Sequence, residues 1–157
     1  MKKKDLIIII ILVLIDRLTK FLVKRFINYL EVINIIKNKL FLTYVTNTGS
    51  AFSLFEGKRL MLIIVSLILL YFLIKYYIKI EDKVEKISIT LILSGLIGNL
   101  IDRIFLGKVI DFIGVGSFPI FNVADSYVVI GIFILLVYVI GSDISDKIIS
   151  RRQRETR

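Results

Sequence analysis

The sequence contains no cysteine and no histidine. Their absence excludes cysteine nucleophiles, histidine-containing catalytic triads, His-ligated zinc, haem attachment, iron–sulfur clusters and disulfides. Any chemistry must therefore use carboxylates, hydroxyls, amides, Lys or Arg. We expect neither a metal nor a cofactor.

Charged residues are few beside apolar ones, at 22% against 57% of the 157 residues. Soluble domains hold roughly 45–50% apolar residues, so the composition predicts a membrane protein. The length predicts a single domain over residues 1–157. Although the net charge is +9, the basic residues stand at the ends of apolar runs, where they orient helices against anionic lipid. We therefore expect membrane lipid, and no nucleic acid, as a partner.

Four apolar stretches approach the roughly 17–25 residues that cross a bilayer. They cover about residues 6–23, 60–80, 87–106 and 125–144. The first also resembles a signal peptide, but no small-residue cleavage site follows it and three charged residues do, so we expect a retained span. The predicted fold class is an all-α membrane protein with four transmembrane helices.

Lys and Arg residues predict the orientation, because basic residues near span ends stay in the cytoplasm. With the N-terminus inside, cytoplasmic segments hold twelve of them, and the external segments 25–59 and 107–124, together with Lys24, hold seven. Both termini are therefore predicted to be cytoplasmic.

The first external segment contains a strand signal. Residues 39–46 are rich in β-branched and aromatic side chains, a turn signal follows at 47–50, and apolar residues resume at 51–55. This pattern predicts a small hairpin, which should lie on the membrane surface or the helix ends because an isolated hairpin is marginal in water. In this setting Asn47 is typical of a turn residue.

Polar residues inside the spans carry more information, because a mid-bilayer charge is costly and usually faces a bundle interior or water. Asp16 has Lys20 four residues later, which predicts an intrahelical ion pair near the outer interface. On the third span Gly95, Asn99 and Arg103 form one stripe. The small residue allows close helix approach, and the amide and guanidinium can hold a carboxylate. Gly98 and Asp102 form a parallel stripe, where Asp102 could simply snorkel to the interface.

Two carboxylates flank the second external segment, Asp111 just after the third span and Asp125 just before the fourth. Gly114, Gly116 and Pro119 between them mark a chain reversal. Antiparallel helices joined by a short link would bring the two acids together at the outer surface. Asn122 and Asp125 also fit a helix N-cap with an acidic third residue, but capping leaves Asp111 unexplained.

Five motifs in order and spacing resemble those of lipoprotein signal peptidase, also called signal peptidase II. They are DRLTK at 16–20, NTGSAF at 47–52, GLIGNLIDR at 95–103, GKVIDF at 107–112 and FNVAD at 121–125. The resemblance implies a bacterial plasma-membrane aspartic endopeptidase that cleaves prolipoprotein signal peptides immediately before a diacylglyceryl-modified cysteine. It also implies a small extracytoplasmic β-sheet cradle and an active site at the outer face.

By motif position, the resemblance makes Asp111 and Asp125 the catalytic pair. It places the supporting and substrate-binding positions at Asp16, Asn47, Gly95, Asn99, Arg103, Asn122 and Ala124. Two carboxylates suffice for peptide hydrolysis without metal or histidine, because adjacent like charges cannot both ionise cheaply, which leaves one base and one acid. Diacylated prolipoproteins are the expected partners, and we expect a monomer.

Two alternatives use different chemistry. A small proton-coupled transporter would use an intramembrane acid such as Asp16 or Asp102, but the acids lie near span ends and the halves show no inverted repeat. A Ser-Lys peptidase would pair Ser50 or Ser53 with Lys58, although no spacing singles out a partner.

Overall fold

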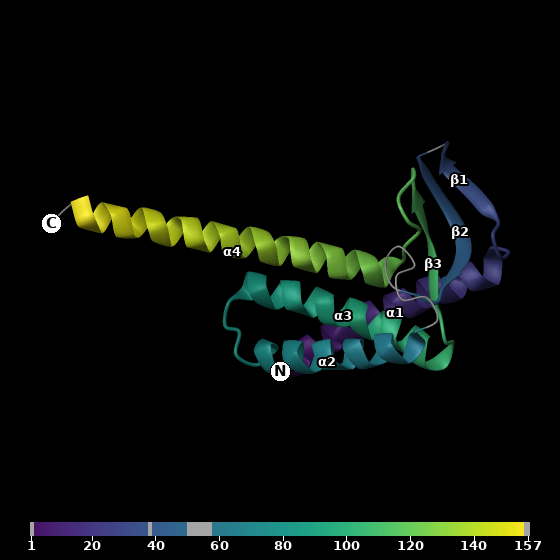
Figure 1. Cartoon of the computed structure of the whole chain (residues 1–157), viewed down its shortest axis with the longest axis horizontal. Helices are drawn as coiled ribbons and strands as arrows, with labels where there is room; N and C mark the ends of the chain where they lie inside the picture. The colour runs from purple at the N-terminus through teal and green to yellow at the C-terminus, as the bar shows by residue number, and fades with distance from the viewer. Residues whose placement is uncertain (1, 38, 50–57, 156–157) are drawn as a thin grey trace.

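The computed structural model describes residues 2–37, 39–49 and 58–155, with side chains through residue 142. Its elements in chain order are α1 (Lys3–Phe26), β1 (Val32–Ile36), β2 (Leu40–Asn47), α2 (Arg59–Tyr77), α3 (Lys83–Phe105), β3 (Val109–Val115) and α4 (Val123–Glu155). Figure 1 shows the helices running along one another and the sheet standing at one end of the bundle. α1 begins and α4 ends on the side away from the sheet.

Within the described residues, three helices are long and apolar enough to cross a membrane, over Arg59–Tyr77, Lys83–Phe105 and Val123–Ser142. They match the second, third and fourth predicted spans to within a few residues at most ends. The helix of α4 continues beyond its apolar part to Glu155. α1 is 24 residues long but is not among these candidates, because charged residues interrupt its apolar run. The structure therefore supports three spans by composition and a fourth helix of sufficient length.

The three strands form one antiparallel sheet in the order β1-β2-β3. The strand predicted at 39–46 is confirmed as β2. β2 pairs with β1 on one side and with β3 on the other, and the predicted second arm at 51–55 lies outside the described residues. β3 was expected only as a chain reversal, because Gly114 and Gly116 obscure its short apolar run.

Helices α3 and α4 pack very closely at two glycines. A Cβ on Gly95 would lie 2.3 Å from the Ala124 carbonyl oxygen, and one on Gly98 would lie 3.2 Å from the Ala124 Cβ. Ala124 itself is fully buried. This contact holds the beginning of α4 against the second half of α3, as expected where small residues allow close approach.

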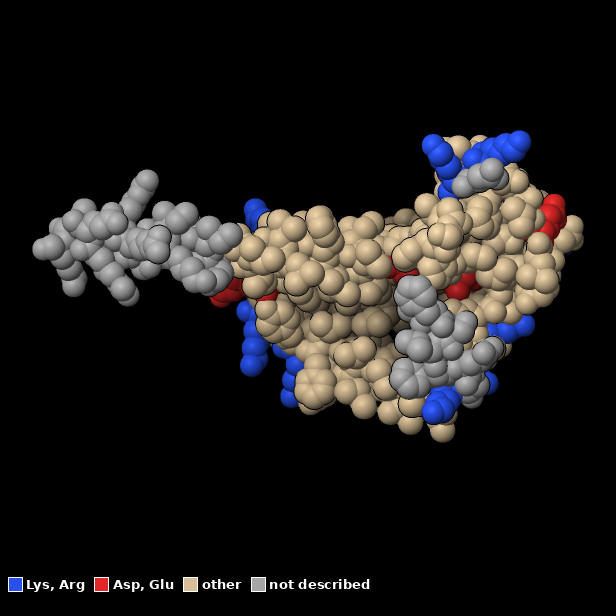
Figure 2. Space-filling model, turned by 45° about the horizontal axis from the view of Figure 1, so that its top comes forward, with Lys and Arg blue, Asp and Glu red and all other residues tan. Residues whose placement is uncertain are grey.

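The outer surface of the helices is apolar. Large hydrophobic side chains such as Phe72, Val129 and Phe133 are each more than three-fifths exposed. Figure 2 shows a broad band without charge on one face, with Lys and Arg gathered toward its two ends. Exposed apolar patches of this extent are rare on soluble monomers. This surface is therefore suited to contact with lipid.

Candidate active site

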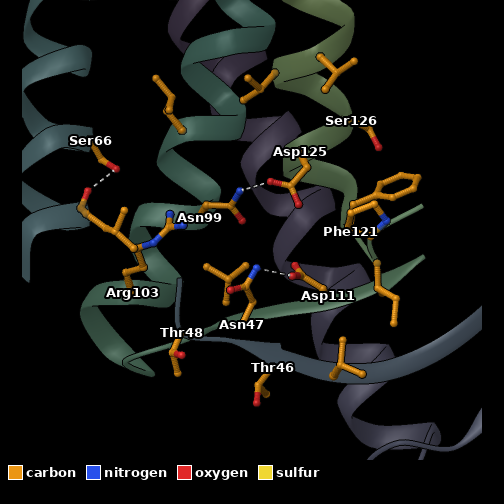
Figure 3. Close-up of a pocket in the computed structure, with 18 of the residues that line it drawn as sticks. Thr46, Asn47, Thr48, Ser66, Asn99, Arg103, Asp111, Phe121, Asp125 and Ser126 are labelled. Atoms are coloured by element: carbon orange, nitrogen blue, oxygen red, sulfur yellow. Dashed lines mark hydrogen bonds between the residues drawn. The ribbon is translucent and has the colours of Figure 1, made fainter. Parts of the chain in front are cut away.

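A cavity of about 890 Å³ lies where the sheet meets α2, α3 and α4. Five polar side chains that the sequence singles out line it, namely Asn47, Asn99, Arg103, Asp111 and Asp125. Figure 3 shows Asp111 and Asp125 directed into this space from β3 and α4. The rest of the wall is largely apolar and includes Leu62, Val65, Leu96, Phe118, Phe121, Val128 and Val129.

Asp111 lies in the middle of β3 and is only 3% exposed. Its two carboxylate oxygens accept hydrogen bonds from two amides, at 2.7 Å from Asn122 Nδ2 and at 3.2 Å from Asn47 Nδ2. The sequence predicted a short link between the third and fourth helices, but the structure has a strand there that pairs with β2. Pairing with β2 fixes the backbone of Asp111, because Val45 lies opposite it in the ladder.

Burial raises the pKa of Asp111 to about 6, and the nearby charge of Asp125 adds to the increase. Hydrogen bonds from Asn122 and Asn47 act in the opposite direction, as does the charge of Lys20. The carboxyl of Asp111 can therefore hold a proton at a pH where an exposed aspartate would not.

Asp125 stands in the first turn of α4 and shares a reciprocal cap with Asn122. The Asn122 side-chain oxygen accepts from the Asp125 backbone N–H at 2.9 Å, and Asp125 Oδ2 accepts from the Asn122 backbone N–H at 3.1 Å. This is the geometry of a capping box, so the capping interpretation is confirmed. The capping box uses only Oδ2 of Asp125, and the other carboxylate oxygen, Oδ1, accepts a hydrogen bond from Asn99.

Asn99 and Asn122 link the two acids. Asn99 Nδ2 donates to Asp125 Oδ1 at 2.7 Å, and Asn122 Nδ2 donates both to Asn99 Oδ1 at 3.1 Å and to Asp111 at 2.7 Å. The positions of both carboxylates are therefore fixed by amides, from Asn99 on α3 and from Asn122 just before α4.

Asp16 and Ala124 meet at the beginning of α4. Asp16 is fully buried, and its Oδ1 accepts from the Ala124 backbone N–H at 3.0 Å. A carboxylate at this position satisfies one of the free N–H groups of the first helical turn and stabilises the helix dipole. Asp16 thus fixes the helix end that carries Asp125, and does not itself line the cavity among the described residues.

Arg103 lines the cavity, where its positive charge acts on Asp125 and Asp111. Its guanidinium donates to the Gly49 backbone oxygen at 3.2 Å. Asn47 accepts from the Gly49 backbone N–H at 2.8 Å, which gives the turn expected after the strand. Arg103 therefore ties the chain after β2 to α3. Of the alternative Ser-Lys pair, Ser50 and Ser53 lie outside the described residues.

Three charged residues outside the predicted set form a cluster of ion pairs with Asp16, and none of them is among the described residues that line the cavity. Lys20 is fully buried, and its ammonium lies 2.9 Å from Asp16 Oδ2, 2.9 Å from Asp102 Oδ2 and 3.0 Å from Asn99 Oδ1. Arg17 pairs with the other oxygen of Asp102. The predicted Asp16–Lys20 pair is present but lies in the bundle interior, and Asp102 is fully buried, so the snorkelling interpretation is wrong.

A family model described as "Signal peptidase (SPase) II" matches residues 8–141. A lipoprotein signal peptidase of Halothermothrix orenii is 41% identical over 133 residues, which cover 84% of this chain and 92% of the relative. A lipoprotein signal peptidase of Caldicellulosiruptor bescii is 44% identical, with 82% of this chain and 85% of the relative covered.

The fold agrees with two solved structures. A bacterial membrane enzyme determined by the in meso method at 2.3 Å resolution matches with a TM-score of 0.86 at 30% identity, over 92% of this chain and 91% of that chain. A second such enzyme, determined at 1.9 Å, matches with a TM-score of 0.79 at 30% identity, over 87% and 92%. The chain belongs to the signal peptidase II family.

Proposed function

We propose that this protein is a membrane aspartic endopeptidase that removes the signal peptide from diacylglyceryl-modified prolipoproteins. Cleavage falls immediately N-terminal to the lipidated cysteine. Family membership supports the reaction, since the relatives are lipoprotein signal peptidases. The observation that carries the proposal is the convergence of Asp111 and Asp125 on one cavity, joined through Asn122.

The two acids divide the chemistry of hydrolysis. Asp111 is the acid: burial raises its pKa to about 6, so it can hold a proton and donate it toward the scissile carbonyl oxygen. Asp125 is the base that takes a proton from the attacking water. Two carboxyls in one site share these roles because both cannot be ionised cheaply.

The shape of the cavity suits a lipidated peptide. Its apolar wall, formed by Leu62, Val65, Leu96, Val128 and Val129, can hold the apolar part of a signal peptide beside α2, α3 and α4. The diacylglyceryl group can remain in the bilayer while the modified cysteine reaches the acids.

The four-span topology is part of the proposal. Two of the three charges that interrupt α1 do not face lipid, because Asp16 and Lys20 are fully buried and pair with each other and with Asp102. The third, Arg17, is paired with Asp102. A buried, paired charge removes the main objection to α1 as a span. With four spans and basic residues retained inside, both termini are cytoplasmic and the site lies at the outer face of the bacterial plasma membrane.

Single cysteines test this topology without background, because the chain has none of its own. In spheroplasts treated with a membrane-impermeant maleimide, Asn28→Cys and Ser117→Cys should be labelled. Lys4→Cys and Glu81→Cys should be labelled only after permeabilisation, because they lie at the opposite end of the bundle. Labelling of Lys4→Cys and Asn28→Cys from the same side would rule out α1 as a span.

The reaction is tested directly with purified protein. Incubation with a diacylated prolipoprotein should release the signal peptide, detected by gel shift and by mass spectrometry of the new N-terminal cysteine. The same precursor without the diacylglyceryl group is the matched control and should stay intact. Equal cleavage of both precursors, or of neither, would contradict the proposed substrate class.

A further inference from the structure

We infer that Lys20 is a positioning residue, whose ammonium fixes the orientation of the Asn99 amide so that Asn99 presents its N–H to Asp125. This inference rests on the proposed function, in which Asp125 is the base. The argument follows one chain of contacts from α1, through α3, to the first turn of α4.

Lys20 is the largest fully buried side chain in the described part of the molecule. An ammonium has three N–H donors and no acceptor, and Lys20 has three oxygens within 3.0 Å, one each from Asp16, Asp102 and Asn99. A buried charge is tolerated only when paired and hydrogen-bonded in this way. The three partners therefore define the position of the ammonium.

Two of the three partners are accounted for by charge. Asp16 and Asp102 are both fully buried carboxylates, and Arg17 supplies the second cation by pairing with Asp102. Two carboxylates and two cations make the cluster neutral. The third contact, to the neutral Asn99, adds nothing to that balance, and its position beside the acids of the cavity gives it a different consequence.

A side-chain amide can face either way, because its oxygen and nitrogen have nearly the same shape. Asn99 Oδ1 accepts from Lys20 at 3.0 Å and from Asn122 at 3.1 Å, which leaves Nδ2 to donate to Asp125 at 2.7 Å. In the reverse orientation the NH₂ group would face the ammonium and the oxygen would face the Asp125 carboxylate. Both contacts would be repulsive, so Lys20 selects the orientation that supports Asp125.

Lys20 acts through another residue and not on the substrate. It is not among the described residues that line the cavity, whereas Asn99 and Asp125 are. Removal of the ammonium should therefore slow turnover and leave substrate binding nearly unchanged. This separates positioning from a role in binding.

The variant Lys20→Met keeps the length of the side chain and removes the donor. On a diacylated prolipoprotein we expect kcat to fall about 10²-fold, with KM within about threefold of wild type, as for loss of an interaction that matters in the transition state. Arg17→Met is the matched control, because it removes the other cation on Asp102 and leaves the Lys20–Asn99 hydrogen bond in place. Its kcat should remain within about threefold of wild type.

A double-mutant cycle tests the route through the amide. If Lys20 acts through Asn99, then Lys20→Met should reduce kcat little further in an Asn99→Ala background. A purely structural role would give the same additional loss in both backgrounds, with a parallel fall in Tm. If Lys20→Met does not fold, the charge-balanced variant Lys20→Met with Asp16→Asn, compared with Asp16→Asn alone, should fold and still show the 10²-fold loss.

The outcomes separate the two proposals. Failure of the wild-type enzyme to cleave the precursor would overturn the proposed function. Cleavage by wild type together with near-normal kcat in Lys20→Met, or with additive losses in the cycle, would overturn only the positioning role.

Discussion

Asp111→Asn and Asp125→Asn are each expected to abolish cleavage of a diacylated prolipoprotein, with a loss of at least about 10³-fold in kcat. Asparagine keeps the size of aspartate, but it can neither take a proton as a base nor donate one as a carboxylic acid. The double variant should be little worse than either single one, because the two acids act as a unit. Single-turnover cleavage followed by gel shift measures all three.

The contrary result is equally specific. Cleavage by Asp125→Asn at close to the wild-type rate would leave Asp125 as a capping residue only, since the substituted amide could still accept from the Asn122 backbone N–H. Cleavage by Asp111→Asn at close to the wild-type rate would remove the acid from the proposed mechanism. A chelator should change none of these rates, because the proposed chemistry uses no metal.

Stability supplies the folding control for this prediction. The native pKa of Asp111, about 6 against an ordinary 3.8, means that the native state binds more protons than the unfolded state between these values. Wild type therefore loses stability as pH rises from about 4 to 6, and the loss persists above pH 6. Asp111→Asn has no carboxyl group to ionise, so it avoids this loss. It should therefore be more stable than wild type at pH 7.5 by about 1–3 kcal/mol.

The loss of one hydrogen bond in Asp111→Asn should keep its gain in stability below the upper end of that range. Asp111 accepts from both Asn47 and Asn122, whereas an amide at this position can accept only one of the two bonds. Thermal unfolding in detergent should show a higher Tm for Asp111→Asn at pH 7.5 and no gain at pH 4. An inactive variant with a raised Tm would separate lost chemistry from lost structure.

The acids of the site could be predicted from the sequence because each stands at the end of a recognisable apolar segment. Asp111 and Asp125 flank one external segment, and any topology that pairs the flanking helices brings them close. The cap at Asn122 is a local feature, so its spacing alone predicts it. These are short-range patterns, and the structure places the residues at one cavity.

The buried charges could not be predicted in the same way. The spacing of Asp16 and Lys20 predicts that they pair, but whether the pair faces lipid, water or another helix depends on which face of α1 packs against α3. Asp102, far along the chain from Lys20, completes the cluster at 2.9 Å. Once that contact is known, the intramembrane acids of the transporter alternative are seen to be held in ion pairs.

The sequence did not predict strands β1 and β3, for a related reason. Four of the five residues of β1 are apolar, although all five are exposed. The strand therefore lacks the alternation of apolar and polar positions by which a half-buried strand is recognised. Gly114 in β3 lies against Phe41, where a Cβ would approach the ring to 2.1 Å. A glycine that makes room for an aromatic ring on the neighbouring strand looks, in the sequence alone, like a turn.

Gly95→Val is expected to reduce both activity and stability by a large amount, because it acts on the contact that sets the distance between α3 and α4. A Cβ at this position would lie 2.3 Å from the Ala124 carbonyl oxygen and 2.6 Å from Val128 Cγ2. The first neighbour is helix backbone, which cannot rotate away as a side chain can. The two helices must therefore separate.

Separation would reach the acids directly. Asn99 lies one turn after Gly95 on α3, Asp125 follows Ala124 on α4, and the bond between Asn99 and Asp125 is only 2.7 Å long. A displacement of about 1 Å is enough to break such a bond and to cost about 10²-fold in rate. We expect at least that loss in kcat, together with destabilisation of about 1–3 kcal/mol from overpacking.

Gly141→Ala is the matched control, since Gly141 is likewise a helical glycine, in α4, but a Cβ there would meet nothing within 4 Å. It should retain wild-type kcat and a Tm at or slightly above wild type, because alanine is the better helix former by about 1 kcal/mol. Gly95→Ala should fall between Gly95→Val and wild type, because its Cβ meets the same carbonyl but leaves Val128 room to rotate. Wild-type activity and Tm in Gly95→Val would show that α3 and α4 can separate without moving Asn99 from Asp125, and the close approach at Gly95 would then have no part in the geometry of the site.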